Sequence, residues 1–106
     1  MRYFIFVIFG LLLSCHSSAK ELKYGSQAPE FELAQLDSLK TVALDDYRGK
    51  VVYLDFWASW CAACAYSFPV LNQLHNEFKD RGFEVLGINL DQDLHQAEHF
   101  LQKIPA

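Results

Sequence analysis

Two cysteines separated by two alanines, Cys61 and Cys64, are the residues of this chain best suited to chemistry. An apolar segment, residues 51–57, precedes them, and a helical pattern follows. If the helix begins at about Cys61, the two sulfurs lie one turn apart on the same face, close enough to bond reversibly. The free N–H groups and the dipole at the start of that helix favour a thiolate at Cys61. The spacing therefore predicts a redox pair in which Cys61 attacks a disulfide and Cys64 resolves the intermediate.

A Cys-x-x-Cys motif has other uses. It can be half of a zinc site, and His95 with His99 supplies a second pair of ligands. The intervening stretch is about twice the zinc-finger spacing and is predicted to contain a helix and a strand, so the match is loose. An inert structural disulfide is a further alternative. The context of the motif favours the redox pair, and we expect no metal or other cofactor.

One carboxylate, Asp55, stands inside the apolar segment of residues 51–57. Burial in such a strand raises the pKa of a carboxyl group unless it is paired. Asp55 either tips outward and bonds to backbone, or it lies beneath the cysteine pair and moves protons for Cys64. The second interpretation makes it a candidate catalytic residue.

The composition limits the size of the core and the class of partner. With 106 residues, 52% hydrophobic and 15% aromatic, the chain can form one small core. The formal net charge is −4, and no basic run or stripe is present. These properties argue against nucleic acid as a partner.

Residues 1–15 read as a secretory signal. Arg2 precedes an apolar run at residues 3–13, which is too short to span a bilayer as a stable helix. The run ends in Leu-Leu-Ser-Cys, which resembles a bacterial lipobox whose cysteine, here Cys15, is acylated and becomes the mature N-terminus. Ordinary cleavage after Ala19 is the alternative. The lipobox predicts a lipid anchor in the periplasm or cell envelope, and it leaves one cysteine pair for redox work.

The remaining pattern alternates strands and helices. Residues 16–27 are polar and predict a tether. Asp91 or Asp93 is expected to cap the last helix, and Asp93 with Gln96 fits a capping box. Strand, helix, strand and helix in that order predict a right-handed βαβ unit and a parallel sheet. The expected elements are short strands at 28–33 and 41–44, a buried central strand at 51–57, a helix at 61–81 bent at Pro69, a strand at 83–90, and a helix that buries Leu94, Ala97, Leu101 and Ile104.

Residues 25–104 resemble the thioredoxin-like proteins of the TlpA/ResA type, which are exported thiol-disulfide oxidoreductases. The resemblance rests on APEFEL at 28–33, LDDYRGKVV at 44–52 and FWASWCAAC at 56–64, followed by a proline. It implies a thioredoxin-like α/β three-layer sandwich that acts on protein thiols and disulfides and receives electrons from a membrane or periplasmic thiol donor. Cytochrome c maturation is a further family-level implication. By this resemblance the site residues are Cys61 as nucleophile, Cys64 as resolving thiol, Asp55 as buried acid, Trp60 as the wall of the site and Pro69 as the helix kink.

The resemblance also implies elements beyond residue 104. A thioredoxin fold continues with two strands and a closing helix, entered through a loop whose cis-proline faces the cysteines. Pro105 comes too early to be that proline. We therefore expect residues 28–106 to form a partial thioredoxin-like domain that holds the active-site half of the fold.

Thiol peroxidases of the AhpC/TSA type are an alternative, because peroxiredoxins share a similar opening over residues 28–50. Their signature P-x-x-x-[TS]-x-x-C fails at both cysteines. Counting back from Cys61 gives Leu54 and Ala58, and counting back from Cys64 gives Trp57 and Cys61. The residues favour a disulfide oxidoreductase, with a peroxidase or a metal-binding envelope lipoprotein as alternatives.

Overall fold

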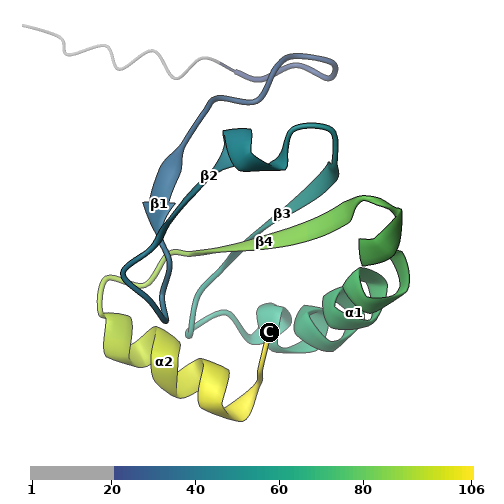
Figure 1. Ribbon diagram of the computed structural model, residues 1–106. Helices are drawn as coiled ribbons and strands as arrows, with labels where there is room; N and C mark the ends of the chain where they lie inside the picture. The colour runs from purple at the N-terminus through teal and green to yellow at the C-terminus, as the bar shows by residue number, and fades with distance from the viewer. Residues whose placement is uncertain (1–20) are drawn as a thin grey trace, which may run out of the picture.

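A computed structural model describes residues 21–106 (Figure 1). The predicted signal segment, its Cys15 and the start of the predicted tether lie outside the described residues. Residues 21–27 are exposed and form no helix or strand. Over residues 21–106, no helix has both the length and the apolar character needed to cross a bilayer. The elements in order are β1 (Glu32–Ala34), β2 (Thr41–Ala43), the 3-10 helix η1 (Leu44–Tyr47), β3 (Val51–Trp57), α1 (Ala62–Phe78), the 3-10 helix η2 (Lys79–Arg81), β4 (Phe83–Asn89) and α2 (Leu94–Lys103).

The predicted βαβ unit is confirmed. Strands β3 and β4, both rich in β-branched and aromatic residues, pair in parallel from Val51 opposite Phe83 to Trp57 opposite Asn89. Helix α1 makes the connection between them. The carboxyl ends of both strands therefore lie side by side, next to the start of α1 (Figure 1).

The expectation that β3 is a buried central strand is wrong for the described residues. Val51 is 68% exposed, Tyr53 46% and Phe56 58%. Among residues 21–106 the only strand paired with β3 is β4, so much of its surface has nothing packed on it. Burial is concentrated at the carboxyl end of the strand, where Trp57 is 3% exposed.

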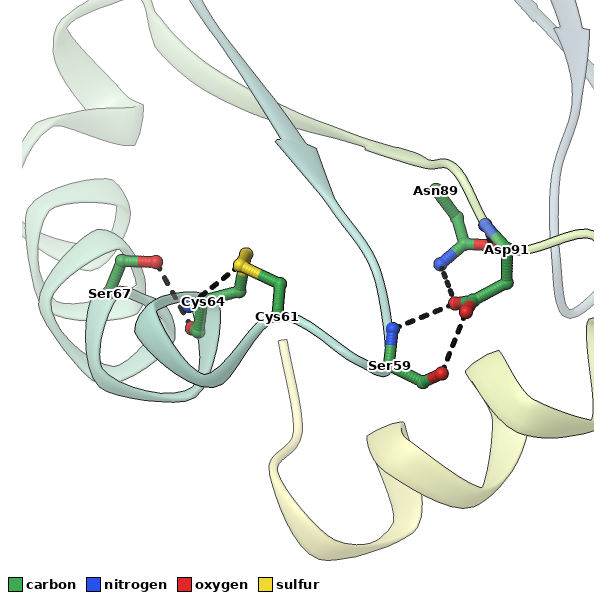
Figure 2. Close-up of a disulfide and its surroundings, with 6 residues drawn as sticks. All are labelled: Ser59, Cys61, Cys64, Ser67, Asn89 and Asp91. Atoms are coloured by element: carbon green, nitrogen blue, oxygen red, sulfur yellow. Dashed lines mark hydrogen bonds between the residues drawn. A yellow bond between two sulfur atoms is a disulfide. The ribbon is translucent and has the colours of Figure 1, made fainter.

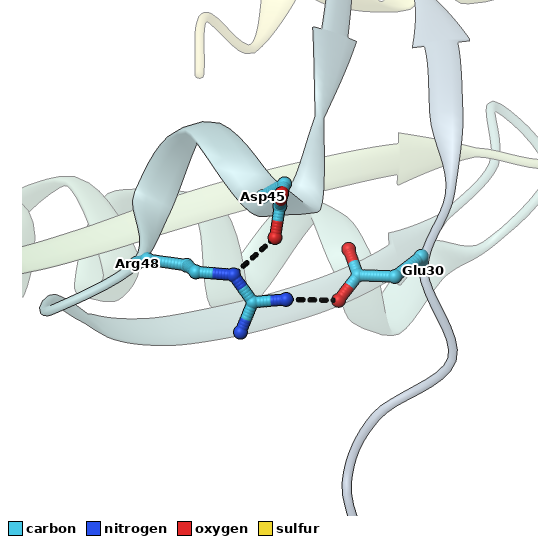
Figure 3. Close-up of polar contacts among 3 residues, drawn as sticks. All are labelled: Glu30, Asp45 and Arg48. Carbon is cyan, nitrogen blue, oxygen red and sulfur yellow. Dashed lines mark hydrogen bonds and ion pairs between the residues drawn. The ribbon is translucent and has the colours of Figure 1, made fainter.

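A second, antiparallel pair joins β1 to β2, with Leu33 opposite Val42. Both strands are shorter than predicted. Arg48 ties this hairpin to the turn before β3, because its guanidinium contacts Asp45 in η1 and, at 2.9 Å, Glu30 ahead of β1 (Figure 3). All three side chains are largely exposed, so each ion pair contributes little to stability.

Helix α1 begins at Ala62 with Cys61 as its N-cap, and Pro69 lies inside it, as predicted. The α-helix ends at Phe78, earlier than predicted, and the chain continues as the 3-10 turn η2. Gly82 then adopts a left-handed conformation with φ of 80°. This is the usual glycine stop after a helix, and it turns the chain into β4.

A small core gathers at the carboxyl ends of the two parallel strands. Trp57 of β3 meets Phe68 of α1 and Phe100 of α2, with ring centroids 5.2 and 5.3 Å away. Phe68 and Phe100 lie 5.6 Å apart, so three elements share one aromatic cluster. Cys64 and Ala97 are buried against it. One thiol of the cysteine pair is therefore part of the core.

Helix α2 is capped by Asp93, as predicted, whose carboxylate accepts from the N–H of His95 at 3.0 Å. The predicted reciprocal bond from the Gln96 side chain is not among the bonds at this cap, where the Gln96 N–H donates to the Asp93 carbonyl. Leu94 is 48% exposed, contrary to expectation. The other predicted contacts of this helix are at least partly buried: Ala97, Leu101 and Ile104.

Candidate active site

The two cysteines form a disulfide at the start of α1, with their Cα atoms 5.4 Å apart (Figure 2). Cys61 is partly exposed, whereas Cys64 is 7% exposed and packs in the core. A partner sulfur can therefore approach Cys61 more readily than Cys64. The division into an attacking Cys61 and a resolving Cys64 stays a prediction, and it requires an asymmetry of this kind.

Cys61 holds the N-cap position through its own sulfur. Its backbone is extended, with φ of −91° and ψ of 97°, and its Sγ accepts from the N–H of Cys64 at 3.3 Å. The same N–H also lies 3.1 Å from the Cys61 carbonyl oxygen. The Cys64 N–H and the positive end of the helix dipole thus meet at one sulfur, and both stabilise a thiolate there once the disulfide is reduced.

The turn that delivers Cys61 to the helix is anchored to the loop after β4. The N–H of Ser59 donates to Asp91 Oδ2 at 2.9 Å and its hydroxyl donates to Asp91 Oδ1 at 2.7 Å (Figure 2). Asn89 donates to the same carboxylate at 2.7 Å. Burial acts to raise the pKa of Asp91, but the bonds from Ser59 and Asn89 outweigh it and hold that pKa below its usual value.

Sequence reasoning missed this anchor, because it considered Asp91 only as a cap for the next helix. The signal in the sequence is the position of Ser59 and Asp91 relative to the ends of the two strands. Parallel pairing sets Trp57 beside Asn89, so the residues that follow each strand emerge at the same edge. A carboxylate two residues after one strand and a serine two residues after its neighbour are the pattern that could have revealed it.

Asp55 lies in β3 opposite Gly87 and is half-buried. Loss of solvent raises the pKa of its carboxyl group, which is the predicted direction. Among the hydrogen bonds of residues 21–106, none joins this carboxylate to Cys64. The structure thus places a carboxyl group with a raised pKa in the strand that leads to the cysteines, and its role stays a prediction.

The other two predicted site residues are on the surface. Trp60, next to Cys61, is 73% exposed and offers a large apolar side chain beside the disulfide. Pro69 is exposed on α1, five residues after Cys64. Of the two, only Trp60 adjoins the sulfur that a partner would meet.

The described residues give no support to the zinc alternative. Over residues 21–106, no group of three or more histidine, cysteine, aspartate or glutamate side chains is arranged to hold a metal ion. His95 is exposed and contacts Glu98 of its own helix at 3.2 Å. The two thiol ligands such a site would need are bonded to each other.

Comparison with known proteins gives consistent results. The model of the AhpC/TSA family matches residues 24–105. The thiol-disulfide oxidoreductase ResA of Bacillus cereus is 30% identical over 95 residues, which are 90% of this chain and 54% of that protein. The ResA protein of Oceanobacillus iheyensis is 35% identical over 88 residues, 80% of this chain and 46% of that protein. The chain thus spans about half the length of these curated relatives.

Solved structures agree on the fold. A crystal structure from Chlorobium tepidum, assigned as the thiol:disulfide interchange protein DsbE, is 45% identical with a TM-score of 0.77, covering 81% of this chain and 60% of that one. A thiol:disulfide interchange protein from Bacteroides is 33% identical with a TM-score of 0.70, covering 77% and 53%. The expected thioredoxin-like α/β fold is therefore confirmed.

Proposed function

The chain belongs to the AhpC/TSA family, and within that family we propose that it is a thiol-disulfide oxidoreductase acting on protein disulfides. The observation that carries the proposal is the Cys61–Cys64 disulfide, in which the sulfur of the partly exposed Cys61 caps α1 while Cys64 is buried. Relatives named thiol-disulfide oxidoreductase and thiol:disulfide interchange protein support the same assignment.

The proposed cycle begins with the reduced pair. The Cys61 thiolate attacks one sulfur of a partner disulfide, a mixed disulfide forms, and the other partner sulfur leaves as a thiolate. Cys64 then loses its proton and attacks the Sγ of Cys61, which releases the second partner sulfur. The partner gains two electrons and the pair returns to the disulfide seen in the structure. A thiol donor restores the dithiol by the same exchange.

Asp55 is the proposed acceptor for the Cys64 proton. A carboxyl group whose pKa is raised by burial can take up and return a proton closer to neutral pH than an ordinary aspartate. Cys64 is buried, so the solvent is a poor base for its thiol. We assign Trp60, exposed beside Cys61, as an apolar contact for the partner protein and Pro69 as the kink of the active-site helix.

The proposed location is the cell envelope. The lipobox-like ending at Cys15 supports export and a lipid anchor, and the resemblance to the TlpA/ResA type supports protein thiols outside the cytoplasm as substrates. Apocytochrome c, with its paired thiols, is one substrate of suitable chemistry. The electron donor would then be a thiol protein of the membrane or periplasm.

Insulin reduction tests the activity. The 106-residue chain should accelerate the precipitation of insulin by dithiothreitol, and a Cys61→Ser variant should run at the rate of dithiothreitol alone. Hydrogen peroxide consumption and zinc or copper retention are measured on the same samples. A chain that consumes peroxide through Cys61 but leaves insulin untouched would be a peroxidase. Stoichiometric zinc or copper retention without insulin reduction would instead favour the alternative of a metal-binding envelope lipoprotein.

A further inference from the structure

The loop between β3 and the cysteine pair is held by a side chain from a distant part of the chain. Asp91, in the loop between β4 and α2, takes one hydrogen bond from the main chain of Ser59 and another from its hydroxyl, each on a different carboxylate oxygen. Figure 2 shows this carboxylate facing Ser59, two residues before Cys61. The two residues are separated by 32 positions in sequence.

The Asp91 carboxylate is itself held in place by Asn89, the last residue of β4. Asn89 donates its amide N–H to Asp91 Oδ2 at 2.7 Å, and its amide oxygen accepts from the N–H of Asp91 at 3.0 Å. The sheet continues into this loop, since the N–H of Leu90 donates to the carbonyl of Trp57 at 2.9 Å. Asp91 is therefore held rigidly to the end of the β3–β4 pair.

Holding Ser59 fixes the direction in which Cys61 enters the helix. Ala58 is 1% exposed, and its carbonyl accepts from the N–H of Cys61 at 3.0 Å, so residues 58–61 form a closed turn. The start of this turn is packed in the core and its second residue is bonded to Asp91. With both constrained, the Cys61 sulfur stays at the N-cap, where it meets the N–H of Cys64.

We propose that Asp91 is a positioning residue for disulfide exchange, keeping the Ser59 turn in place so that the Cys61 thiolate remains at the helix N-terminus when the disulfide opens. This inference rests on the proposed function and adds a residue to its site. Asp91 never touches the reacting sulfurs and acts only through the turn.

An aspartate suits this role better than an asparagine. Three donors converge on its two oxygens: the Ser59 N–H, the Ser59 hydroxyl and the Asn89 amide. A carboxylate accepts on both oxygens, whereas an amide has one acceptor oxygen and would turn an NH2 group toward one of the donors. Bonds to a carboxylate are also stronger than those between neutral groups.

Alkylation kinetics of the reduced full chain test the proposal. Iodoacetamide is reacted from about pH 5 to about pH 9, and peptide mass spectrometry follows the Cys61 adduct alone. The variants are Ser59→Ala, which removes one bond and no charge, Ser59→Thr, which keeps the hydroxyl, and Asp91→Asn. Asp93→Asn is the matched control, because it removes a nearby charge from a residue that bonds to α2 and not to Ser59. Thermal unfolding is recorded for each.

We expect Ser59→Ala to slow Cys61 alkylation at pH 7 by about threefold, because the thiolate loses part of its interaction with the helix terminus. Ser59→Thr should restore the rate, and Asp93→Asn should leave it unchanged. Asp91→Asn should also slow the reaction, although loss of a negative charge alone would favour the thiolate and speed it. Wild-type rates and pH midpoints in Ser59→Ala and Asp91→Asn, with lower melting temperatures, would overturn the proposal and leave Asp91 a purely structural role.

The alkylation test of Asp91 does not depend on whether the proposed oxidoreductase function is correct. Alkylation needs no partner protein, so a chain that fails to reduce insulin still reports whether Asp91 controls Cys61. Conversely, if the chain reduces insulin but Ser59→Ala and Asp91→Asn leave the Cys61 alkylation rate unchanged, the proposed function stands and only the positioning role of Asp91 is lost.

Discussion

The backbone N–H of Cys64 donates to the Sγ of Cys61 at 3.3 Å, while the two sulfurs of the same residues are bonded to each other. A disulfide sulfur is a weak acceptor, and a thiolate at the same place is a strong one. The donor therefore gains most when the bond between the sulfurs opens. This relationship stabilises the reduced pair with Cys61 ionised, which makes the disulfide a better oxidant than one without such a donor.

A Cys64→Ser variant should trap the exchange halfway. Cys61 can still attack a partner disulfide, but no second thiol is present to release the partner, so a mixed disulfide accumulates. The reduced variant is incubated with insulin that has its native disulfides. Non-reducing electrophoresis should then show the mixed-disulfide adduct, which dithiothreitol removes. Cys61→Ser should form no such adduct. A Cys15→Ser change in both backgrounds ensures that the third cysteine contributes nothing to the bands.

Asp55→Asn should slow turnover without lowering the reactivity of the Cys61 thiolate. If Asp55 takes the proton of Cys64, the variant loses at least about tenfold in insulin reduction, while the alkylation rate of Cys61 changes little. Asp80→Asn, in the exposed turn η2, is the control for loss of one carboxylate. If Asp55→Asn lowers insulin reduction and Cys61 alkylation equally, then Asp55 acts on Cys61 or on the stability of the fold, and not on Cys64.

The same variant should alter stability in a pH-dependent way. Burial raises the folded pKa of Asp55 above its reference value of 3.8, so the folded chain holds this proton more tightly than the unfolded chain. The resulting stabilisation is complete below the unfolded pKa and is lost as pH rises through the folded pKa. Asp55→Asn should therefore melt above wild type at pH 7, and the difference should shrink as the pH falls toward that of the unfolded group. Identical melting curves at every pH would contradict the assigned shift.

Local pattern accounts for most of what could be predicted. The strand at 51–57 and the start of a helix at about Cys61 each depend on residues close in sequence, and the structure follows them. The direction of the Asp55 pKa shift was also predictable, because a carboxylate inside an apolar strand loses solvent wherever the strand packs.

Features that depend on distant packing were not predicted. The Ser59–Asp91 contact depends on the parallel register of β3 and β4, which brings together loops that are 32 residues apart. The exposure of Phe56 likewise depends on what covers each face of β3, and an apolar side chain does not reveal that. Sequence alone identified the cysteines and not the residue that holds their turn.

Cys15 carries the proposal of a lipid anchor. In a bacterial host with lipoprotein processing, the chain should incorporate labelled palmitate and fractionate with membranes, because the anchored mature N-terminus carries the acyl chains. Cys15→Ser should abolish both. Cys64→Ser changes a cysteine elsewhere in the chain and should leave labelling intact. Labelling that survives Cys15→Ser, or a soluble wild-type chain cleaved after Ala19, would contradict the anchor.

The aromatic cluster around Phe68 should dominate the stability of this small core. Phe68 is 4% exposed and contacts both Trp57 and Phe100, so Phe68→Ala opens a cavity where three elements meet. We expect a loss of about 3 kcal/mol in the free energy of unfolding, measured by urea titration. Phe56→Ala makes the same chemical change at a side chain that is 58% exposed, and it should cost less than about 1 kcal/mol. Since Cys64 packs on the same cluster, Phe68→Ala should also expose that thiol and speed its alkylation, whereas Phe56→Ala should not.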